Sequence, residues 1–117
     1  MKVIFLGTNP PVFRATSIGY LYEIAQKNEV WLLTEKLDDY TMSLLEDKTH
    51  FPGLDKIILF EQPCGGNILF KWIRTVRTLK KTMKEFRPNI AIAPSDIWPV
   101  EMIFMRYAKR YGIPNRI

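Results

Sequence analysis

The sequence has few of the side chains that build metal sites and disulfides. It contains one cysteine, Cys64, and one histidine, His50. A single cysteine excludes an internal disulfide and fits the reducing environment of the cytoplasm. One cysteine and one histidine are also too few for a common zinc site, so we predict no metal centre. We expect both residues to be surface or loop side chains, although His50 in a flexible loop could serve as a base.

Long apolar runs are missing as well. No stretch reaches the roughly 18 to 20 apolar residues that a membrane-spanning helix requires. The opening MKVIFLG has one lysine and five apolar residues before Gly7, which is too short for a signal peptide and predicts a first strand. We therefore predict a cytoplasmic protein, with peripheral association at the inner face of a membrane as an added possibility.

Two glycine-rich phosphate-binding motifs are absent. The first turn reads GTNPP at residues 7–11 and lacks the G-x-G-x-x-G spacing that brings a pyrophosphate close to the backbone. NAD and FAD binding is therefore disfavoured. The sequence also has no G-x-x-x-x-G-K-[ST] loop, which excludes a P-loop NTPase. We expect no cofactor to bind within this chain.

What the sequence does contain is a regular alternation of strand and helix patterns. The 117 residues are 47% hydrophobic and 25% charged, as in one globular domain. The pattern predicts an α/β fold: a Rossmann-like open parallel sheet of about five strands in the order 3-2-1-4-5, with helices on both faces. Expected strands are residues 3–6, 30–34, 56–60, 90–93 and a fifth from residue 113; expected helices are residues 12–27, a short one capped by Asp38, one from residue 67 to Pro88, and one that Gly112 ends.

The polar corner after the fourth predicted strand is the first place to look for chemistry. Ligands of open α/β sheets bind outside the carboxyl ends of the strands, where Asp96 is expected. Enclosed by Ile97, Trp98 and Pro99, its carboxylate would have a raised pKa and could take a hydroxyl proton. Helix capping by Ser95 or Asp96 is the structural alternative.

Two further charged residues are expected at predicted helix starts. Arg14 is expected in the first helical turn, near the carboxyl end of the first strand, where it could meet a phosphate or a carboxylate, or remain a solvated surface arginine. Glu101 is expected in the first turn of the last helix, as a favourable partner of the helix dipole.

The positive charge belongs to one element. Residues 67–87 hold seven Lys/Arg against one Glu, a net +6, which leaves −1 for the rest of a chain whose total is +5. This pattern is typical of helices on anionic membranes, but also of ordinary amphipathic helices on a sheet. The predicted membrane or partner surface comprises Lys71, Trp72, Arg74, Arg77, Lys80, Lys81 and Lys84. No nucleic-acid-binding motif accompanies the charge, so a nucleic-acid partner is disfavoured.

The order of these pieces resembles a known family. The stretches YLYEIAQKNEVWLLTE, EFRPNIAIAPSDIWP and RYAKRYGIPNRI resemble the N-terminal, acceptor-side domain of GT-B glycosyltransferases, in which a KPD-V-IA strand is followed by a helix and a GIP strand. The resemblance covers nearly the whole chain as a pattern of elements. It departs from some lipid-acceptor members, whose glycine-rich first loop is replaced here by GTNPP.

The resemblance implies transfer of a sugar from a nucleotide-sugar donor to an acceptor, such as a lipid-linked sugar or a polysaccharide. The donor would sit on a C-terminal domain, so residues 1–117 would be the N-terminal part of a longer two-domain enzyme, inactive by itself. Asp96 would be the catalytic base, and the acceptor would contact Thr8, Asn9, Arg14, Ser95 and Trp98.

Two other functions stay open from the sequence. One is a non-enzymatic module that docks on an anionic membrane or a protein partner through residues 67–87. The other is a formyltransferase-like domain, whose opening VIFLGT is similar. That family has an Asn-x-His pair near the fifth strand, whereas this chain has Asn115-Arg116-Ile117.

Overall fold

A computed structural model describes residues 1–7, 17–60, 68–93 and 99–116. Its elements are β1 (Lys2–Gly7), α2 (Ile18–Lys27), β2 (Glu29–Thr34), α3 (Asp39–Glu46), β3 (Leu54–Leu59), α4 (Ile68–Phe86), β4 (Ile90–Ile92), α5 (Pro99–Arg110) and β5 (Asn115–Arg116). Strands and helices alternate along the chain, as the sequence pattern predicts.

The strands form one open sheet in the order β3-β2-β1-β4-β5. Every neighbouring pair is parallel, so all carboxyl ends lie at one edge of the sheet. Four of the strands have three or more residues, and β5 adds a two-residue pairing beside β4. The α/β class, the parallel Rossmann-like sheet and the predicted strand order are confirmed.

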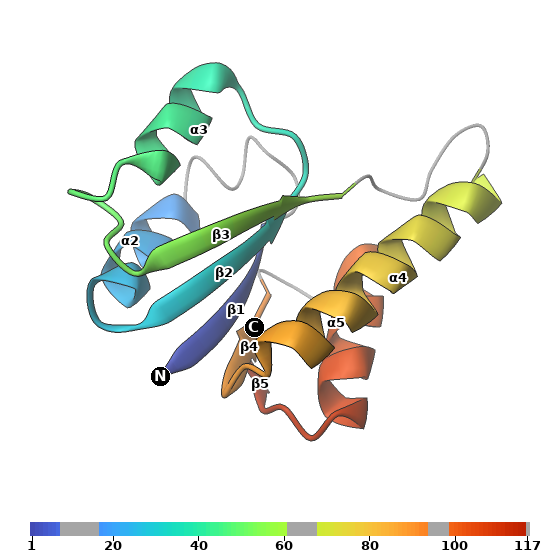
Figure 1. The fold of residues 1–117 in the computed structure, drawn as a ribbon. Helices are drawn as coiled ribbons and strands as arrows, with labels where there is room; N and C mark the ends of the chain where they lie inside the picture. The colour runs from blue at the N-terminus through green and yellow to red at the C-terminus, as the bar shows by residue number, and fades with distance from the viewer. Residues whose placement is uncertain (8–16, 61–67, 94–98, 117) are drawn as a thin grey trace.

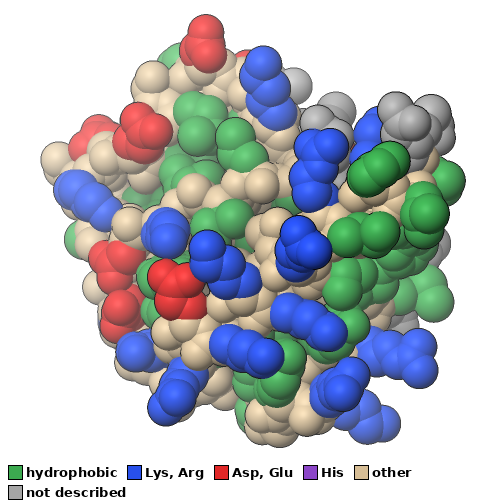
Figure 2. Space-filling model, turned by 45° about the vertical axis from the view of Figure 1, so that its right-hand side comes forward, with side chains coloured by type: hydrophobic (Ala, Val, Ile, Leu, Met, Phe, Trp, Pro, Cys, Tyr) green, Lys and Arg blue, Asp and Glu red, His purple; other side chains and the backbone are tan. Residues whose placement is uncertain are grey.

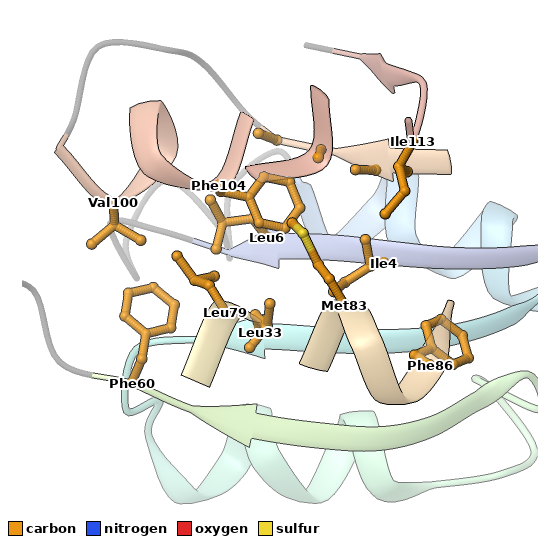
Figure 3. Packing of buried hydrophobic residues seen from close by; sticks show 13 residues of the cluster. Ile4, Leu6, Leu33, Phe60, Leu79, Met83, Phe86, Val100, Phe104 and Ile113 are labelled. Carbon is orange, nitrogen blue, oxygen red and sulfur yellow. The ribbon is translucent and has the colours of Figure 1, made fainter. Parts of the chain in front are cut away.

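Helices cover both faces of the sheet, α2 and α3 on one side and α4 and α5 on the other (Figure 1). Successive side chains of a strand point to opposite faces, so β1 contributes to two cores. Val3 and Phe5 pack in the cluster with α2 and α3, whereas Ile4 and Leu6 pack in the cluster with α4 and α5 (Figure 3). This two-sided burial explains why the strands read as continuous apolar runs.

Interactions within one turn of the chain determine where three of the helices begin or end. Asp38 precedes α3 and accepts a hydrogen bond from the backbone N–H of Thr41 at 3.2 Å, which confirms the predicted cap. Asn28 ends α2 as predicted, with its backbone N–H bonded to the carbonyl of Ile24. Gly112 has φ +72° just after α5, a left-handed conformation that glycine adopts without strain.

The predicted bounds of the third strand are shifted. The sequence pattern placed it at residues 56–60, whereas β3 is Leu54–Leu59 and Phe60 follows it. The strand begins earlier because Leu54 pairs with Val30 of β2 across a register irregularity. Leu54 is buried, so it belongs to the core although a charged residue, Asp55, separates it from the apolar run.

The apolar residues of α4 recur every three or four positions and predict one buried stripe, but the structure buries only part of this stripe, which comprises Leu69, Trp72, Ile73, Val76, Leu79, Met83 and Phe86. Leu79, Met83 and Phe86 are buried, as expected. Leu69 and Ile73 are 69% and 47% exposed, and Trp72 and Val76 are only partly buried. Two threonines, Thr75 and Thr82, are buried instead.

The length of α4 explains the difference. Its 19 residues span about 28 Å, whereas a strand of six residues spans about 20 Å. The carboxyl end of the helix lies against the amino edge of the sheet. There the ring of Phe86 stacks on that of Trp31 of β2, with 4.5 Å between the ring centroids. The amino-terminal half of α4 therefore extends past the carboxyl edge of the sheet (Figure 1).

Candidate functional site

The carboxyl ends of β1 and β4 are neighbours. Phe5 pairs with Ile92, so the two chain segments that follow these strands both start at the same edge. The strand order reverses here, because β2 lies on one side of β1 and β4 on the other. In open α/β sheets this switch point is where ligands bind.

The catalytic and acceptor-binding residues predicted from the sequence follow these two strands. Thr8, Asn9 and Arg14 come after β1, and Ser95, Asp96 and Trp98 come after β4. All six lie outside the described residues, as does Cys64. Their roles stay predictions, and what the described strands add is that β1 and β4, which precede these residues, pair with each other.

A second feature of the carboxyl edge is an open pocket of about 320 Å³. It lies where β2 and β3 end and where the amino-terminal half of α4 extends past the sheet. Its lining residues are Lys36, Leu59, Phe60, Lys71, Arg74, Thr75 and Thr78. We call this set the basic pocket.

The charged side chains in the described lining of the basic pocket are all cationic. Lys36, Lys71 and Arg74 line it, and none of the described lining residues is acidic. Lys71 and Arg74 are three residues apart on α4, so their side chains leave neighbouring turns of one helix. Lys36 reaches the pocket from the segment after β2. The fold thus gathers three cations from two distant parts of the chain.

The hydroxyl groups of the basic pocket are engaged within the helix or buried. Thr78 donates its hydroxyl hydrogen to the carbonyl oxygen of Arg74 at 2.9 Å. Thr75 is 2% exposed. The cationic groups of the described lining are the ammonium groups of Lys36 and Lys71 and the guanidinium group of Arg74.

The predicted membrane or partner surface lies on α4, and Figure 2 shows many of the molecule's blue side chains gathered on one face. Arg74, Arg77, Lys81 and Lys84 are exposed. Lys80 is partly buried, and its ammonium lies 5.3 Å from the centroid of the Tyr107 ring on α5. Trp72 and Lys71 are partly buried as well.

The amino-terminal half of α4 also exposes apolar side chains. Ile68 and Phe70 are 48% and 66% exposed, beside the exposed Leu69 and Ile73. Apolar side chains gather beside the basic ones on the face seen in Figure 2. We call Ile68, Leu69, Phe70 and Ile73 the apolar end of α4.

Glu101 lies in the first turn of α5, as predicted, but it is buried rather than exposed. Only 1% of its surface is exposed. A helix N-terminus favours a negative charge, which fits the predicted dipole role. The charge pattern of the sequence did not indicate burial, because glutamates in first helical turns usually face solvent.

His50 lies away from both features of the carboxyl edge. It precedes β3, and the side chain of Gln26 near the end of α2 donates to its carbonyl oxygen at 2.7 Å, so it belongs to the amino edge of the sheet. Its Nδ1 atom lies 2.9 Å from Oδ2 of Asp47. The Thr49 backbone N–H and then His50 donate to Asp47 and hold the pKa of this carboxyl below its usual value. His50 therefore lies at the opposite edge of the sheet from the carboxyl ends of β1 and β4.

Within residues 1–7, 17–60, 68–93 and 99–116, no three His, Cys, Asp or Glu side chains come together as a metal site. No helix in this described part is long and apolar enough to cross a membrane.

No protein-family model and no curated protein matches the chain. Two crystal structures of the C-terminal domain of a hydrogenase from Pyrococcus furiosus are similar to it in structure, with TM-scores of 0.60 and 0.55. Their sequence identities are 16% and 18%, and each alignment covers 98% of this chain and 88% of the other. At this identity, the likeness shows that this chain shares an α/β fold with that domain.

Proposed function

We propose that this chain is the acceptor-binding domain of a GT-B glycosyltransferase, which transfers a sugar from a nucleotide-sugar donor to an acceptor. Asp96 is the general base in this proposal, and Thr8, Asn9, Arg14, Ser95 and Trp98 contact the acceptor. The donor binds to a second domain that would follow this one in the chain.

The observation that carries the proposal is the adjacent position of the ends of β1 and β4. A base and an acceptor-binding loop must meet at one place, and the pairing of Phe5 with Ile92 starts both segments at the same edge of the sheet. The Rossmann-like strand order, with its switch point at β1, supports the same reading. Fold alone hosts many functions, so the proposal depends on the residues that follow these strands.

The test uses the complete natural gene product, whose intact mass is measured first. A mass well above 13.8 kDa is expected, because the donor domain adds to this chain. The complete protein is then incubated with a panel of nucleotide sugars and simple acceptors, and nucleotide release and glycosylated product are measured. A native mass near 13.8 kDa, or the absence of transfer across the panel, would contradict the proposal.

The exposed side chains of α4 favour a second candidate function, docking on an anionic membrane. The apolar end of α4 offers side chains that can enter the boundary between headgroups and acyl chains. The exposed Arg74, Arg77, Lys81 and Lys84 on the same helix would attract anionic lipid headgroups. A glycosyltransferase domain that acts on a lipid-linked acceptor would use such a surface.

Charge reversal tests the docking candidate. Because each basic side chain near an anionic surface contributes about 1 kcal/mol, reversing Arg77, Lys81 and Lys84 together should weaken binding to phosphatidylserine vesicles by about 100-fold or more. Vesicle sedimentation at increasing salt measures the effect, and binding of the unmodified chain should fall as the salt screens the charges.

The matched control reverses three exposed cations of other helices, Lys27, Lys109 and Arg110, which changes the net charge by the same amount. This control should retain most of the binding. Equal losses in the two triple variants would show a general charge effect and would remove α4 as the docking surface.

A further inference from the structure

We propose that the layer formed by α4 and α5 binds single-stranded nucleic acid, with one base stacked on Tyr111 and the phosphates held by a row of cations on α4. This binding requires no sugar transfer, so it goes beyond the proposed function and the two proposals can fail separately. The sequence contains no recognised nucleic-acid-binding motif. The proposal rests instead on features that the packing of α4 against α5 creates.

The first feature is the division of charge between two parts of the molecule. Residues 68–93 and 99–116, which include α4 and α5, carry eleven Lys/Arg against two Glu. Residues 17–60, which include α2 and α3, carry four lysines against eight acidic residues. In Figure 2 the blue side chains gather over α4 and α5, and most of the red side chains lie toward the left of the view. A surface of one sign attracts a polyanion and orients it toward that surface.

The second feature is a row of exposed cations along α4. They follow one another at every third or fourth position and comprise Arg74, Arg77, Lys81, Lys84 and, just past the end of the helix, Arg87. Residues spaced in this way lie on one side of a helix. Glu85, the one acidic residue of α4, has its Oε1 3.8 Å from Nζ of Lys56 on β3, so it pairs with a cation outside the row. Proteins that bind single strands follow the phosphate backbone with such a row of basic side chains.

The third feature is an open pocket of about 520 Å³ where α4 and α5 end. Its described lining residues are Met83, Lys84, Arg87, Pro88, Tyr111, Gly112 and Ile113, and we call this set the tyrosine pocket. These residues and their neighbours in the chain, 82–89 and 110–114, all belong to the described part. Lys84 and Arg87 are the charged residues of this lining, and neither forms an ion pair with another described residue. The row of cations therefore ends in a concave basic site.

The fourth feature is the ring of Tyr111, which is 37% exposed. The ring of Tyr107 stacks on it, with 6.3 Å between the ring centroids and 24° between the ring planes. Nζ of Lys80 in turn lies 5.3 Å from the centroid of the Tyr107 ring. These contacts hold the Tyr111 ring in place as a platform. A base would stack on its other face, because every base has a flat π face.

The two helix ends do not cancel this positive charge. A helix C-terminus carries about half a negative charge, from carbonyl groups without partners. Here the carbonyl of Met83 accepts from the N–H of Arg87 at 3.0 Å. The carbonyl of Ala108 accepts from the N–H of Ile113 at 2.8 Å. Lys84 and Arg87 each add a full positive charge, so the tyrosine pocket favours a phosphate.

An anionic membrane would also be attracted by the charge, but this end of α4 lacks what a membrane needs. Membrane association requires apolar side chains that enter the boundary between headgroups and acyl chains. Among the described residues 74–93 and 103–115, Tyr111 is the one large apolar side chain that is exposed. The apolar end of α4 lies at the opposite end of the helix. A single ring in a concave basic site fits a nucleotide better than a lipid surface.

The direct test measures the fluorescence anisotropy of a labelled oligothymidylate of about 15 nucleotides, within the site sizes of about 4 to 16 nucleotides of single-strand-binding domains. An abasic oligonucleotide of the same length is the matched ligand control, because it keeps the phosphates and lacks the bases. The intact oligonucleotide should bind at least about fivefold more tightly. With about four phosphate contacts, the logarithm of the association constant should fall against the logarithm of the salt concentration with a slope of about −3.

Variants of Tyr111 locate the stacked base. Tyr111→Leu should weaken binding of the intact oligonucleotide by about fivefold or more and leave binding of the abasic one unchanged. Tyr111→Phe keeps the ring and should bind both as the unmodified chain does. Tyr40→Leu is the matched control, because Tyr40 is 78% exposed on α3, and it should change neither affinity. A variant that failed to fold would lose both ligands, so misfolding cannot imitate the expected result.

Paired charge variants locate the phosphates. Lys84→Gln with Arg87→Gln should weaken binding of both oligonucleotides by about tenfold and reduce the steepness of the salt slope by about 1. Lys27→Gln with Lys36→Gln removes the same charge from exposed positions within residues 17–60. This control should change the affinity by less than about twofold, because those charges lie outside the row and are screened by solvent.

Several results would overturn the proposal. They are equal affinity for the intact and abasic oligonucleotides, equal effects of Tyr111→Leu on both, and equal losses in the two charge variants. Binding to phosphatidylserine vesicles without binding to the oligonucleotide would assign the layer to a membrane. Thymidine monophosphate that binds as tightly as the oligonucleotide would remove the strand as the ligand. Each of these results is independent of whether the complete gene product transfers sugar.

Discussion

Replacement of Gly53 by alanine should lower the free energy of unfolding by about 3 kcal/mol and the melting temperature by about 10 °C. A Cβ atom at this position would lie 1.9 Å from the carbonyl oxygen of Asn28 and 2.6 Å from that of Ala25. Both are backbone atoms, so no side-chain rotation can relieve the overlap. Thermal and urea unfolding followed by circular dichroism measure the loss.

The backbone around Gly53 explains why the segment cannot simply move away. Its N–H donates to the carbonyl of Ala25 at 2.8 Å, and its carbonyl accepts from the N–H of Val30 at 2.7 Å. These two bonds join the end of α2, the start of β2 and the turn before β3. A shift large enough to admit a methyl group would weaken both of them, at about 1 kcal/mol each.

Gly19→Ala is the matched control for this prediction. Gly19 is exposed in α2, and among the described residues a Cβ atom there would meet nothing within 4 Å. Alanine favours the helix, so this variant should be stabilised by about 0.5 kcal/mol. If Gly53→Ala unfolds at the same temperature as the unmodified chain, the close approach at Gly53 is wrong.

Asp96→Asn should reduce the turnover of the complete enzyme by about 100-fold or more, because a general base contributes about 10² to 10⁴ to the rate. Asparagine keeps the size of the side chain but cannot accept the acceptor's hydroxyl proton. The KM for the nucleotide sugar should change little, since the donor binds to the other domain in the proposed function. Steady-state kinetics with the donor and the acceptor varied separately measure both values.

Asp55→Asn provides the control, because Asp55 is an exposed carboxylate near the start of β3, at the amino edge of the sheet. The turnover of the Asp55→Asn enzyme should stay within about twofold of that of the unmodified enzyme. Near-normal turnover in Asp96→Asn would leave Asp96 with the capping role that the sequence also allowed, and the catalytic assignment would then be withdrawn.

Much of the fold is predictable from local patterns. The strands of a parallel sheet covered on both faces are short apolar runs, and each of the first four stood out between turn residues such as Gly7 and Pro88. The cap at Asp38 and the stop at Gly112 follow from side-chain and backbone chemistry within one turn of the chain. These features need no knowledge of distant residues.

Local sequence patterns did not predict which apolar residues of α4 are buried. Period-3.6 spacing identifies a helix and one apolar stripe, but it does not say how far the sheet beneath extends. Leu69 and Ile73 fit the stripe as well as Leu79 does, yet only Leu79 lies over the sheet and is buried. The burial of Thr75 and Thr82 was not predicted either, because a threonine in a helical pattern does not indicate burial.

The order of the elements, the helix caps and the concentration of positive charge in residues 67–87 follow from the sequence, because each depends on neighbours within a few positions. The basic pocket depends on the tertiary structure. Lys36 lies far from Lys71 and Arg74 in the chain. These side chains line one pocket only because β2 and β3 end beside the amino-terminal half of α4, which extends past the sheet. Which distant side chains come together depends on how the elements pack, and the spacing of residues in the sequence does not predict it.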